Sequence, residues 1–177
     1  MKFFDVLPQL AENELLKRGV MTDELLYCVK ADLDGEGGYV DVYITFTKDT
    51  LCILRGYEEY GKMKRGQKRK NLVSFTVSGY DEYPIDSIEE MYVDRYANSA
   101  RLMIKDKSGK EFPIARFSLG FADKFEKFSQ RVNCTAKNEP IDDRLLEGVK
   151  THCPTCGEPY PDPNRPVCPR CVDRRSV

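Results

Sequence analysis

The fold of this chain is constrained most by short segments in which apolar and polar residues alternate. The clearest is VDVYITF, whose apolar positions would share one face of a strand: Val40, Val42, Ile44 and Phe46. Asp41, Tyr43 and Thr45 would then lie on the opposite face, because successive side chains of a strand point to opposite faces of a sheet. VSFTV and ARLMIKD repeat the pattern, with apolar positions at Val73, Phe75, Val77, Leu102 and Ile104. These segments predict β-strands.

Four further stretches are strand candidates, and turn-forming sequences separate the candidates from one another. The additional stretches span residues 25–33, 51–55, 88–96 and 111–116. The connections read DGEGG, TKDT, ANSA and DKSGK, and they carry residue types that are typical of tight turns. The sequence therefore predicts about seven short strands, mostly antiparallel.

Two amphipathic helices are predicted, one on each side of the strand region. The first spans residues 7–18, with Pro8 suited to its first turn and Gly19 suited to its end. Its apolar face consists of Leu7, Leu10, Ala11 and Leu15. The second lies within residues 118–132, and its apolar stripe consists of Phe121, Phe125, Phe128 and Val132. Such a stripe must pack on something, and the open end of a curved sheet is the available partner.

Seven strands followed by one amphipathic helix is the element order of a pleckstrin-homology-like (PH-like) barrel. The run from YPIDSIEEMY to FSQRV also resembles the C-terminal half of bacterial PH-like and GRAM-like domains. The resemblance covers roughly residues 22–132. It implies a mainly β (α+β) fold, a seven-stranded barrel capped by a C-terminal helix. It further implies a binding module for lipid headgroups, peptides or neighbouring domains, and not an enzyme.

The C-terminal end carries four cysteines in two CxxC pairs. Cys153 and Cys156 form the first pair, Cys168 and Cys171 form the second, and 11 residues lie between the pairs. Two such turns facing each other present four thiolates as a tetrahedron, which is the arrangement that suits Zn²⁺. In a proline-rich segment without a core of its own, the metal would supply the folding free energy. The spacing therefore predicts a small structural zinc ribbon.

Two disulfides, a redox dithiol and a rubredoxin-like iron site are the alternatives for these cysteines. The start MKFFDVLPQLAENE has too short an apolar run for a signal peptide, which favours a reducing compartment and metal over disulfides. Rubredoxin-like sites pack aromatic residues between more widely separated pairs, whereas here only Tyr160 lies between them. A four-cysteine site is closed to water and substrate, so we expect its role to be structural. His152 is interpreted as a bystander.

These features divide the chain into four parts. We expect an N-terminal helix at residues 1–20, the PH-like barrel with its capping helix at 21–134, a linker at 135–151 and the zinc ribbon at 152–177. The linker is assigned because its sequence is mostly polar, apart from a short apolar patch at Leu145 and Leu146.

Composition restricts the possible functions. The chain of 177 residues is 41% hydrophobic and 32% charged, which is typical of soluble globular domains. No run of about 18 apolar residues is present that would cross a bilayer. The net charge of -1 argues against an electrostatic attraction of the whole chain to nucleic acid. We expect a cytoplasmic protein.

The segment CPTCGEPYPDPNRPVCPRCVDRR also resembles the cysteine-rich segment in N-terminal extensions of some bacterial ABC-type exporters. In those proteins it precedes the first transmembrane helix and the ATPase domain. The resemblance implies that the partners are the transmembrane and ATPase domains of one parent protein, with the chain at the inner face of the membrane. We expect that the sequence ending at Val177 is a fragment. Arg174 and Arg175 would then lie on the cytoplasmic side.

A basic run between the third and fourth predicted strands is a candidate contact with an anionic membrane surface or a partner. Its residues are Lys62, Lys64, Arg65, Lys68, Arg69 and Lys70. Each basic residue near such a surface adds up to about 1 kcal/mol, but we favour the simpler interpretation of a solvated hairpin loop. The preceding GYEEYGKM nearly matches a phosphate-binding loop. Met63 lacks the hydroxyl that binds Mg²⁺, so we reject nucleotide binding there.

The remaining candidates favour structural interpretations. Cys28 and Cys52 lie in predicted strands and should fill core space, and Cys134 lies at a helix end. The acids of YDEYPIDSIEE are interpreted as a solvated turn and strand edge: Asp81, Glu82, Asp86, Glu89 and Glu90. With one histidine in the chain, a Ser-His-Asp or Cys-His arrangement of the usual kind is not expected.

The sequence thus favours a non-catalytic regulatory or scaffolding module with a structural Zn²⁺ site, belonging to an ABC-type exporter. No catalytic residue and no small-molecule substrate is expected on this chain. The alternative is a free-standing zinc-ribbon protein that binds nucleic acid or the transcription machinery. An enzyme would need a pocket with convergent titratable groups, which the sequence does not predict.

Overall fold

A computed structural model of the chain describes residues 5–62 and 71–141. The elements in chain order are α1 (Gln9–Leu16), η1 (Thr22–Glu24), β1 (Tyr27–Asp34), β2 (Tyr39–Phe46), β3 (Thr50–Tyr60), β4 (Leu72–Pro84), η2 (Ile85–Ser87), β5 (Ile88–Arg95), β6 (Ser99–Asp106), β7 (Glu111–Ser118), η3 (Leu119–Phe121) and α2 (Ala122–Ala136). The predicted linker beyond residue 141 and the predicted zinc ribbon lie outside the described residues.

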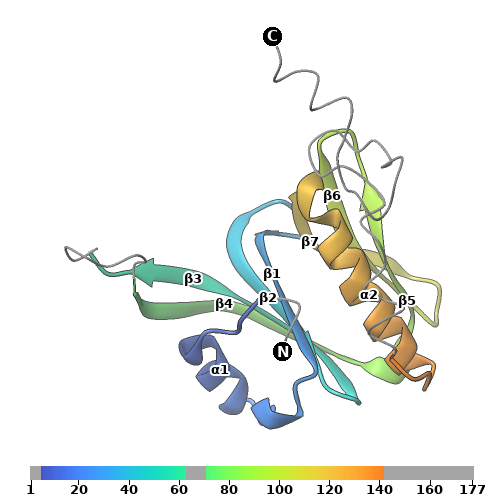
Figure 1. The fold of residues 1–177 in the computed structure, drawn as a ribbon, viewed down its shortest axis with the longest axis horizontal. Coiled ribbons are helices and arrows are strands. Elements are labelled where there is room, and N and C mark those ends of the chain that lie inside the picture. Colours follow the sequence, from blue (N-terminus) through green and yellow to red (C-terminus); the bar gives the residue numbers. More distant parts are fainter. Residues whose placement is uncertain (1–4, 63–70, 142–177) are drawn as a thin grey trace, which may run out of the picture.

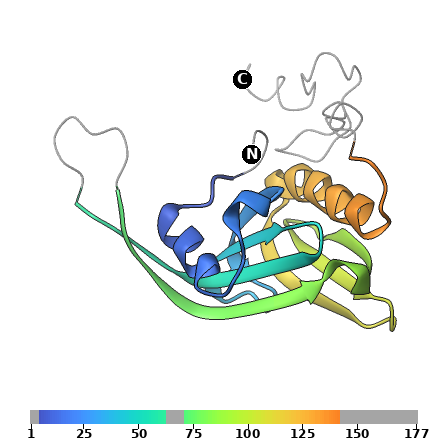
Figure 2. The same ribbon diagram turned by 90° about the horizontal axis from the view of Figure 1, so that it is seen from below.

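Within the described residues, the seven strands form one open antiparallel sheet in the order β4-β3-β2-β1-β7-β6-β5. The predicted mainly β fold with a C-terminal helix is therefore confirmed. β3 and β4 are longer than the alternation indicated, because their ladder continues to the pair Tyr60–Leu72. In Figure 1 this β3–β4 ribbon projects beyond the other strands, and Figure 2 shows that the sheet is curved.

One face of the sheet, called here the α2 face, carries the larger apolar cluster. Its β2 members are the alternate residues predicted from the sequence: Val40, Val42, Ile44 and Phe46. α2 covers this face beside β5, β6 and β7 (Figure 1). The Phe125 ring stacks on Phe117 with their centroids 3.8 Å apart, and Phe128 meets Phe46 edge to face. The predicted stripe of α2 is confirmed at Phe125, Phe128 and Val132, which are fully buried.

Phe121 departs from that prediction. Its side chain is 52% exposed, because the chain forms the short helix η3 there and α2 begins only at Ala122. The 3.6-residue period that aligns Phe121 with the stripe does not apply before the helix begins.

The opposite face, called here the α1 face, holds a second apolar cluster. α1 contributes Ala11 and Leu15, and the sheet contributes Cys28, Tyr43, Cys52 and Leu54. Tyr43 and Thr45 alternate with the α2-face residues as predicted, and both are buried. Helices from opposite ends of the described chain cover the two faces of the sheet.

The predicted N-terminal helix is confirmed, with bounds of Gln9–Leu16 in place of 7–18. Pro8 is the residue before the helix and not part of its first turn. Gly19 ends the turn that follows, with φ of +83°, a conformation that glycine adopts at little cost. The backbone N–H of Val20 donates to the Leu15 carbonyl at 3.1 Å, which returns the chain toward β1.

The two halves of the sheet are joined by a short ladder. β1 and β7 share two residue pairs, Leu33–Arg116 and Asp34–Ala115. Gly35 follows directly, and a Cβ atom there would lie 2.2 Å from the Pro113 carbonyl oxygen. Glycine is therefore required for the close approach of the two backbones.

Asp5, in the segment before α1, forms hydrogen bonds with the backbone of β1. Its N–H donates to the Cys28 carbonyl at 3.1 Å, and its carboxylate accepts from the Lys30 N–H at 2.7 Å. The Lys124 ammonium group of α2 donates to the same carboxylate at 2.6 Å. Asp5 therefore ties the N-terminal segment to both the sheet and α2.

Candidate functional site

The predicted zinc ligands Cys153, Cys156, Cys168 and Cys171 lie outside the described residues, as does His152. In residues 5–62 and 71–141, no group of three or more His, Cys, Asp or Glu side chains is arranged to hold a metal ion. Cys28 and Cys52 are buried in the sheet, as predicted, and burial raises the pKa of both thiols. Cys134 lies in α2 and is partly exposed.

The basic run falls between β3 and β4, where it was predicted. Lys62 is exposed directly after β3. Its other members lie outside the described residues: Lys64, Arg65, Lys68, Arg69 and Lys70. The rejected phosphate-loop match begins inside β3, since Gly56 to Tyr60 are strand residues paired with β4. Packing requires glycine at position 56, because a Cβ atom there would lie 2.4 Å from the Phe75 ring.

A polar network lies on the α1 face where the β3–β4 ribbon leaves the sheet. We call it the Lys30–Glu58 network. The Lys30 ammonium group lies 2.6 Å from Glu58 Oε2 and 2.8 Å from Asp41 Oδ1. The hydroxyls of Tyr43 and Tyr60 donate to the Glu58 carboxylate, whose side chain is 3% exposed. A buried carboxylate needs such partners to remain charged.

The pKa values in this network move away from neutrality. Burial raises the pKa of Glu58, but hydrogen bonds from Lys30, Tyr43 and Tyr60 outweigh it and leave the pKa lowered. Burial likewise lowers the pKa of Lys30, and its bonds to Asp41 and Glu58 leave it raised. Burial and the Glu58 carboxylate raise the pKa of Tyr43. General acid–base catalysis uses groups with pKa values near the working pH, so this pattern is that of a structural ion pair.

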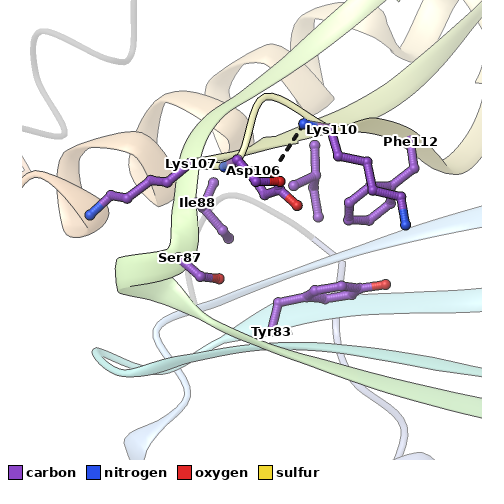
Figure 3. A pocket seen from close by; sticks show the side chains of 9 residues that line it. Tyr83, Ser87, Ile88, Asp106, Lys107, Lys110 and Phe112 are labelled. Carbon is purple, nitrogen blue, oxygen red and sulfur yellow. Dashed lines mark hydrogen bonds between the residues drawn. The ribbon is translucent and has the colours of Figure 1, made fainter.

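A pocket of about 380 Å³ opens at the end of the sheet where β4 passes into β5. We call it the β4–β7 pocket. It is lined by Tyr83, Ser87, Ile88, Ile104, Asp106, Lys107, Ser108, Lys110 and Phe112. Figure 3 shows Tyr83 on one side, the turn between β6 and β7 on the other, and Ile88 between them. The backbone N–H of Lys107 donates to the Ser87 carbonyl at 3.0 Å and holds the two sides together.

The walls of the β4–β7 pocket are aromatic. The Tyr83 and Phe112 rings lie 5.3 Å apart with an interplanar angle of 33°. The Lys110 ammonium group lies 5.9 Å from the centroid of the Phe112 ring. Both rings pack against the α2-face cluster, to which the buried Ile88 and Ile104 belong. The pocket is therefore the place where this core reaches the surface.

The β6–β7 turn forms the polar rim of the pocket. Asp106 Oδ1 accepts hydrogen bonds from the N–H and hydroxyl of Ser108, at 2.9 and 2.5 Å, and from the N–H of Lys110 at 3.0 Å. These bonds lower the pKa of Asp106, so its carboxylate is charged at neutral pH. Gly109 has φ of +84°, which the predicted DKSGK turn requires.

Tyr83 presents a hydroxyl that remains protonated. Burial, and then the Asp81 carboxylate, raise the pKa of Tyr83. Asp81 is itself ion-paired with Arg55. In the described part of the chain, the Tyr83 hydroxyl makes no hydrogen bond, so this donor is open to solvent or a ligand.

A smaller hollow of about 270 Å³ lies where β1 and β7 separate. Three cations border it, and each already has a partner. Lys124 is bound to Asp5, Lys30 belongs to the Lys30–Glu58 network, and Arg116 donates to the Gly35 carbonyl at 3.2 Å. Of these contacts, the one from Arg116 links β7 to the turn after β1 and so joins the two halves of the sheet.

Neither the β4–β7 pocket nor the Lys30–Glu58 network was predicted from the sequence. The DKSGK turn was predicted, but nothing in its spacing brings it to Tyr83, more than 20 residues earlier. The acids near β5 were interpreted as solvated, and the structure agrees at Glu89, which is exposed and pairs with Lys105 at 3.0 Å.

Comparison of the chain with protein family models, with curated proteins and with solved structures returned no significant match. Among the helices formed by the described residues, none is both long enough and apolar enough to cross a bilayer.

Proposed function

We propose that this chain is a non-catalytic regulatory or scaffolding module built on a PH-like fold. The supporting observation is the antiparallel strand order β4-β3-β2-β1-β7-β6-β5, followed by α2 lying across one face. A PH-like domain has the same succession of seven strands and a C-terminal helix. Such domains present sheet edges, loops and one end of a curved sheet to their partners.

The electrostatics of the described residues support a binding function over catalysis. The Lys30–Glu58 network holds a carboxylate whose side chain is 3% exposed, and its pKa values move away from neutral pH. Catalytic groups are usually shifted toward the working pH. We therefore propose that this network fixes the β3–β4 ribbon and does not transfer protons.

We further propose that Cys153, Cys156, Cys168 and Cys171 bind one structural Zn²⁺ ion. Support comes from the sequence alone, through the two CxxC pairs and the prolines around them. Four thiolates would complete a tetrahedral shell with Zn–S distances of about 2.3 Å. The metal would fold a segment that has few apolar residues to bury.

The resemblance of the cysteine segment supports a place in an ABC-type exporter. In this proposal, the partners are the transmembrane and ATPase domains of the parent protein. The basic run near Lys62 would lie close to the anionic inner surface of the membrane. A coding sequence that continues past codon 177 into apolar stretches of about 20 residues would support this placement. A stop codon there, with salt-dependent nucleic-acid binding, would favour the free-standing alternative.

The metal proposal is tested on the full chain purified without chelators. We expect elemental analysis to find about one zinc ion per chain. Cys156→Ser should lose the metal, because one of four ligands is removed. Cys134→Ser is the matched control, since Cys134 lies in α2 and outside the motif. A chain without metal, or equal retention by the two variants, would contradict the proposal.

A further inference from the structure

The β4–β7 pocket has the size and lining of a site for a small apolar group. Its volume of about 380 Å³ falls within the range of ligand pockets, about 300–1,000 Å³. Ile88 and Ile104 are 2% and 1% exposed, so they form a closed aliphatic floor, and the more accessible apolar surface comes from Tyr83 and Phe112. The Tyr83 and Phe112 rings supply flat apolar walls. Apolar surface of a ligand would therefore be removed from water here.

One end of the pocket offers two donors without acceptors. In residues 5–62 and 71–141, the Lys110 ammonium group makes no ion pair, and the Tyr83 hydroxyl makes no hydrogen bond. In Figure 3 the hydroxyl of Tyr83 and the ammonium group of Lys110 point to the same end of the pocket, beside Phe112. A protonated hydroxyl and an ammonium group together can bind a carboxylate.

The charge of the rim also favours an anion. Asp106 is the carboxylate that lines the pocket, and its Oδ1 is occupied by three hydrogen bonds within the turn. The lining thus has two lysines, Lys107 and Lys110, against the single carboxylate of Asp106. In Figure 3 the Lys107 side chain extends away from the rings. Asp81, which also acts on Tyr83, is neutralised by Arg55.

We propose that the β4–β7 pocket binds a small amphipathic carboxylate. Its apolar body lies against Ile88, Ile104 and the aromatic walls, and its carboxylate accepts from Lys110 and the Tyr83 hydroxyl. This ligand was not predicted from the sequence. The inference does not depend on the metal or on an exporter, because the residues that carry it lie in the sheet and in the turn between β6 and β7.

The experiment titrates the full chain with octanoate, 1-octanol and acetate by calorimetry, with NMR to locate the binding. Octanoate has both parts of the proposed ligand, 1-octanol lacks the negative charge and acetate lacks the apolar body. We expect octanoate to bind most tightly, with chemical-shift changes at residues 83, 88 and 104–112. The zinc content should not change the result, so failure here is distinguishable from failure of the metal proposal.

Three variants test the anion end. Tyr83→Phe keeps the ring and removes the hydroxyl, and we expect octanoate to bind about three- to tenfold more weakly. Lys110→Gln should weaken octanoate binding about two- to fivefold and leave 1-octanol unchanged. Asp106→Asn keeps the oxygen that accepts in the turn and should strengthen octanoate binding. A fourth variant, Lys105→Gln, is the control: it removes the same charge from β6, where Lys105 pairs with Glu89, and should not change octanoate binding.

Several outcomes would overturn the proposal. Equal affinity for octanoate and 1-octanol would show that the pocket does not recognise the carboxylate group. Equal effects of Lys110→Gln and Lys105→Gln would show a general charge effect. Shift changes elsewhere in the molecule, or no binding of octanoate, would exclude the pocket as its site.

Discussion

The two faces of the sheet are both buried, but they are stabilised in different ways. On the α2 face, apolar residues meet apolar residues, as in the stacked pair of Phe117 and Phe125. On the α1 face, an apolar patch beneath Leu15 gives way to the Lys30–Glu58 network at the base of the β3–β4 ribbon. The α2 face is therefore mainly an apolar core, which also holds the buried Arg131 of α2 over the Tyr27 ring. The α1 face combines an apolar core with a partly buried ion pair.

This difference predicts which substitutions each face tolerates. Truncating a buried apolar side chain lowers the free energy of unfolding by an amount that grows with the volume of the cavity left behind. A buried ion pair behaves differently, because removing one partner leaves the other desolvated and unpaired. The α2 face should therefore respond to the size of a substituted side chain. The network should respond to charge and pH.

The largest effect is expected on the α2 face. Phe128→Ala should lower the free energy of unfolding by about 3–5 kcal/mol, because it removes a buried ring that contacts Phe46. Urea unfolding followed by circular dichroism measures this. Phe121→Ala, in η3 directly before α2, is the matched control, and since that ring is 52% exposed we expect a loss of less than about 1 kcal/mol. Similar losses in the two variants would contradict the description of this face.

The next effect tests whether α1 belongs to the same cooperative unit. Leu15→Ala should lower the free energy of unfolding by about 2–4 kcal/mol, because Leu15 is fully buried in the α1-face cluster. Leu16→Ala, at the exposed neighbouring position, is the control. If Leu15→Ala costs less than about 1 kcal/mol, α1 is only loosely attached and the comparison of two buried faces fails.

A smaller effect is expected in the network. Glu58→Gln keeps the shape of the side chain but removes the charge opposite Lys30, which still has Asp41. We expect a loss of about 1–3 kcal/mol at pH 7. Glu59→Gln is the control, since Glu59 is exposed and accepts a hydrogen bond from the Ser74 hydroxyl. Equal losses would mean that burial of the carboxylate has no consequence.

The stability difference between the wild type and Glu58→Gln should depend on pH. The pKa of Glu58 is lower in the folded chain than in the unfolded chain, where it is about 4.3. Its stabilisation is therefore complete above the unfolded pKa and is lost as the pH falls through the folded pKa. The stability difference between the wild type and Glu58→Gln should be largest near neutrality and shrink below about pH 4. A difference that grows on acidification would reverse the assigned sign.

The smallest effect concerns an edge strand. Asn133 of α2 accepts from the Met91 N–H at 2.7 Å and donates to the Met91 carbonyl at 2.9 Å, which occupies the free edge of β5. Asn133→Ala should cost about 1–2 kcal/mol and speed hydrogen exchange of the Met91 amide. Gln130→Ala, at an exposed position of the same helix, is the control. Unchanged exchange at Met91 would show that the edge is protected by another contact.

Much of the fold could be predicted because its signal is local. The alternation in β2 and the stripe of α2 depend on neighbouring residues, and both occur where expected. The turn that follows α1 at Gly19 and the turn at Gly109 also depend on single glycines with positive φ. The exposure of Phe121 was missed because helix period alone does not locate the first turn of a helix.

The candidate sites could not be predicted because their residues are distant in the sequence. Lys30 and Glu58 meet only after β1, β2 and β3 have paired. Tyr83 and Phe112 come together because β4 lies at one edge of the sheet and its end turns toward the β6–β7 hairpin. Neither pair has a spacing that distinguishes it from unrelated tyrosines, lysines and acids.

The amino-acid sequence by itself determined the strands, the two helices and the turns, because backbone preference and side-chain periodicity act over a few residues. It also carries the four-cysteine spacing on which the metal proposal depends. The tertiary structure decided which second face became buried, which carboxylate became ionised inside the protein and where the core opened into a pocket. These outcomes depend on contacts between distant segments, and such contacts exist only once the sheet has curved and both helices have packed.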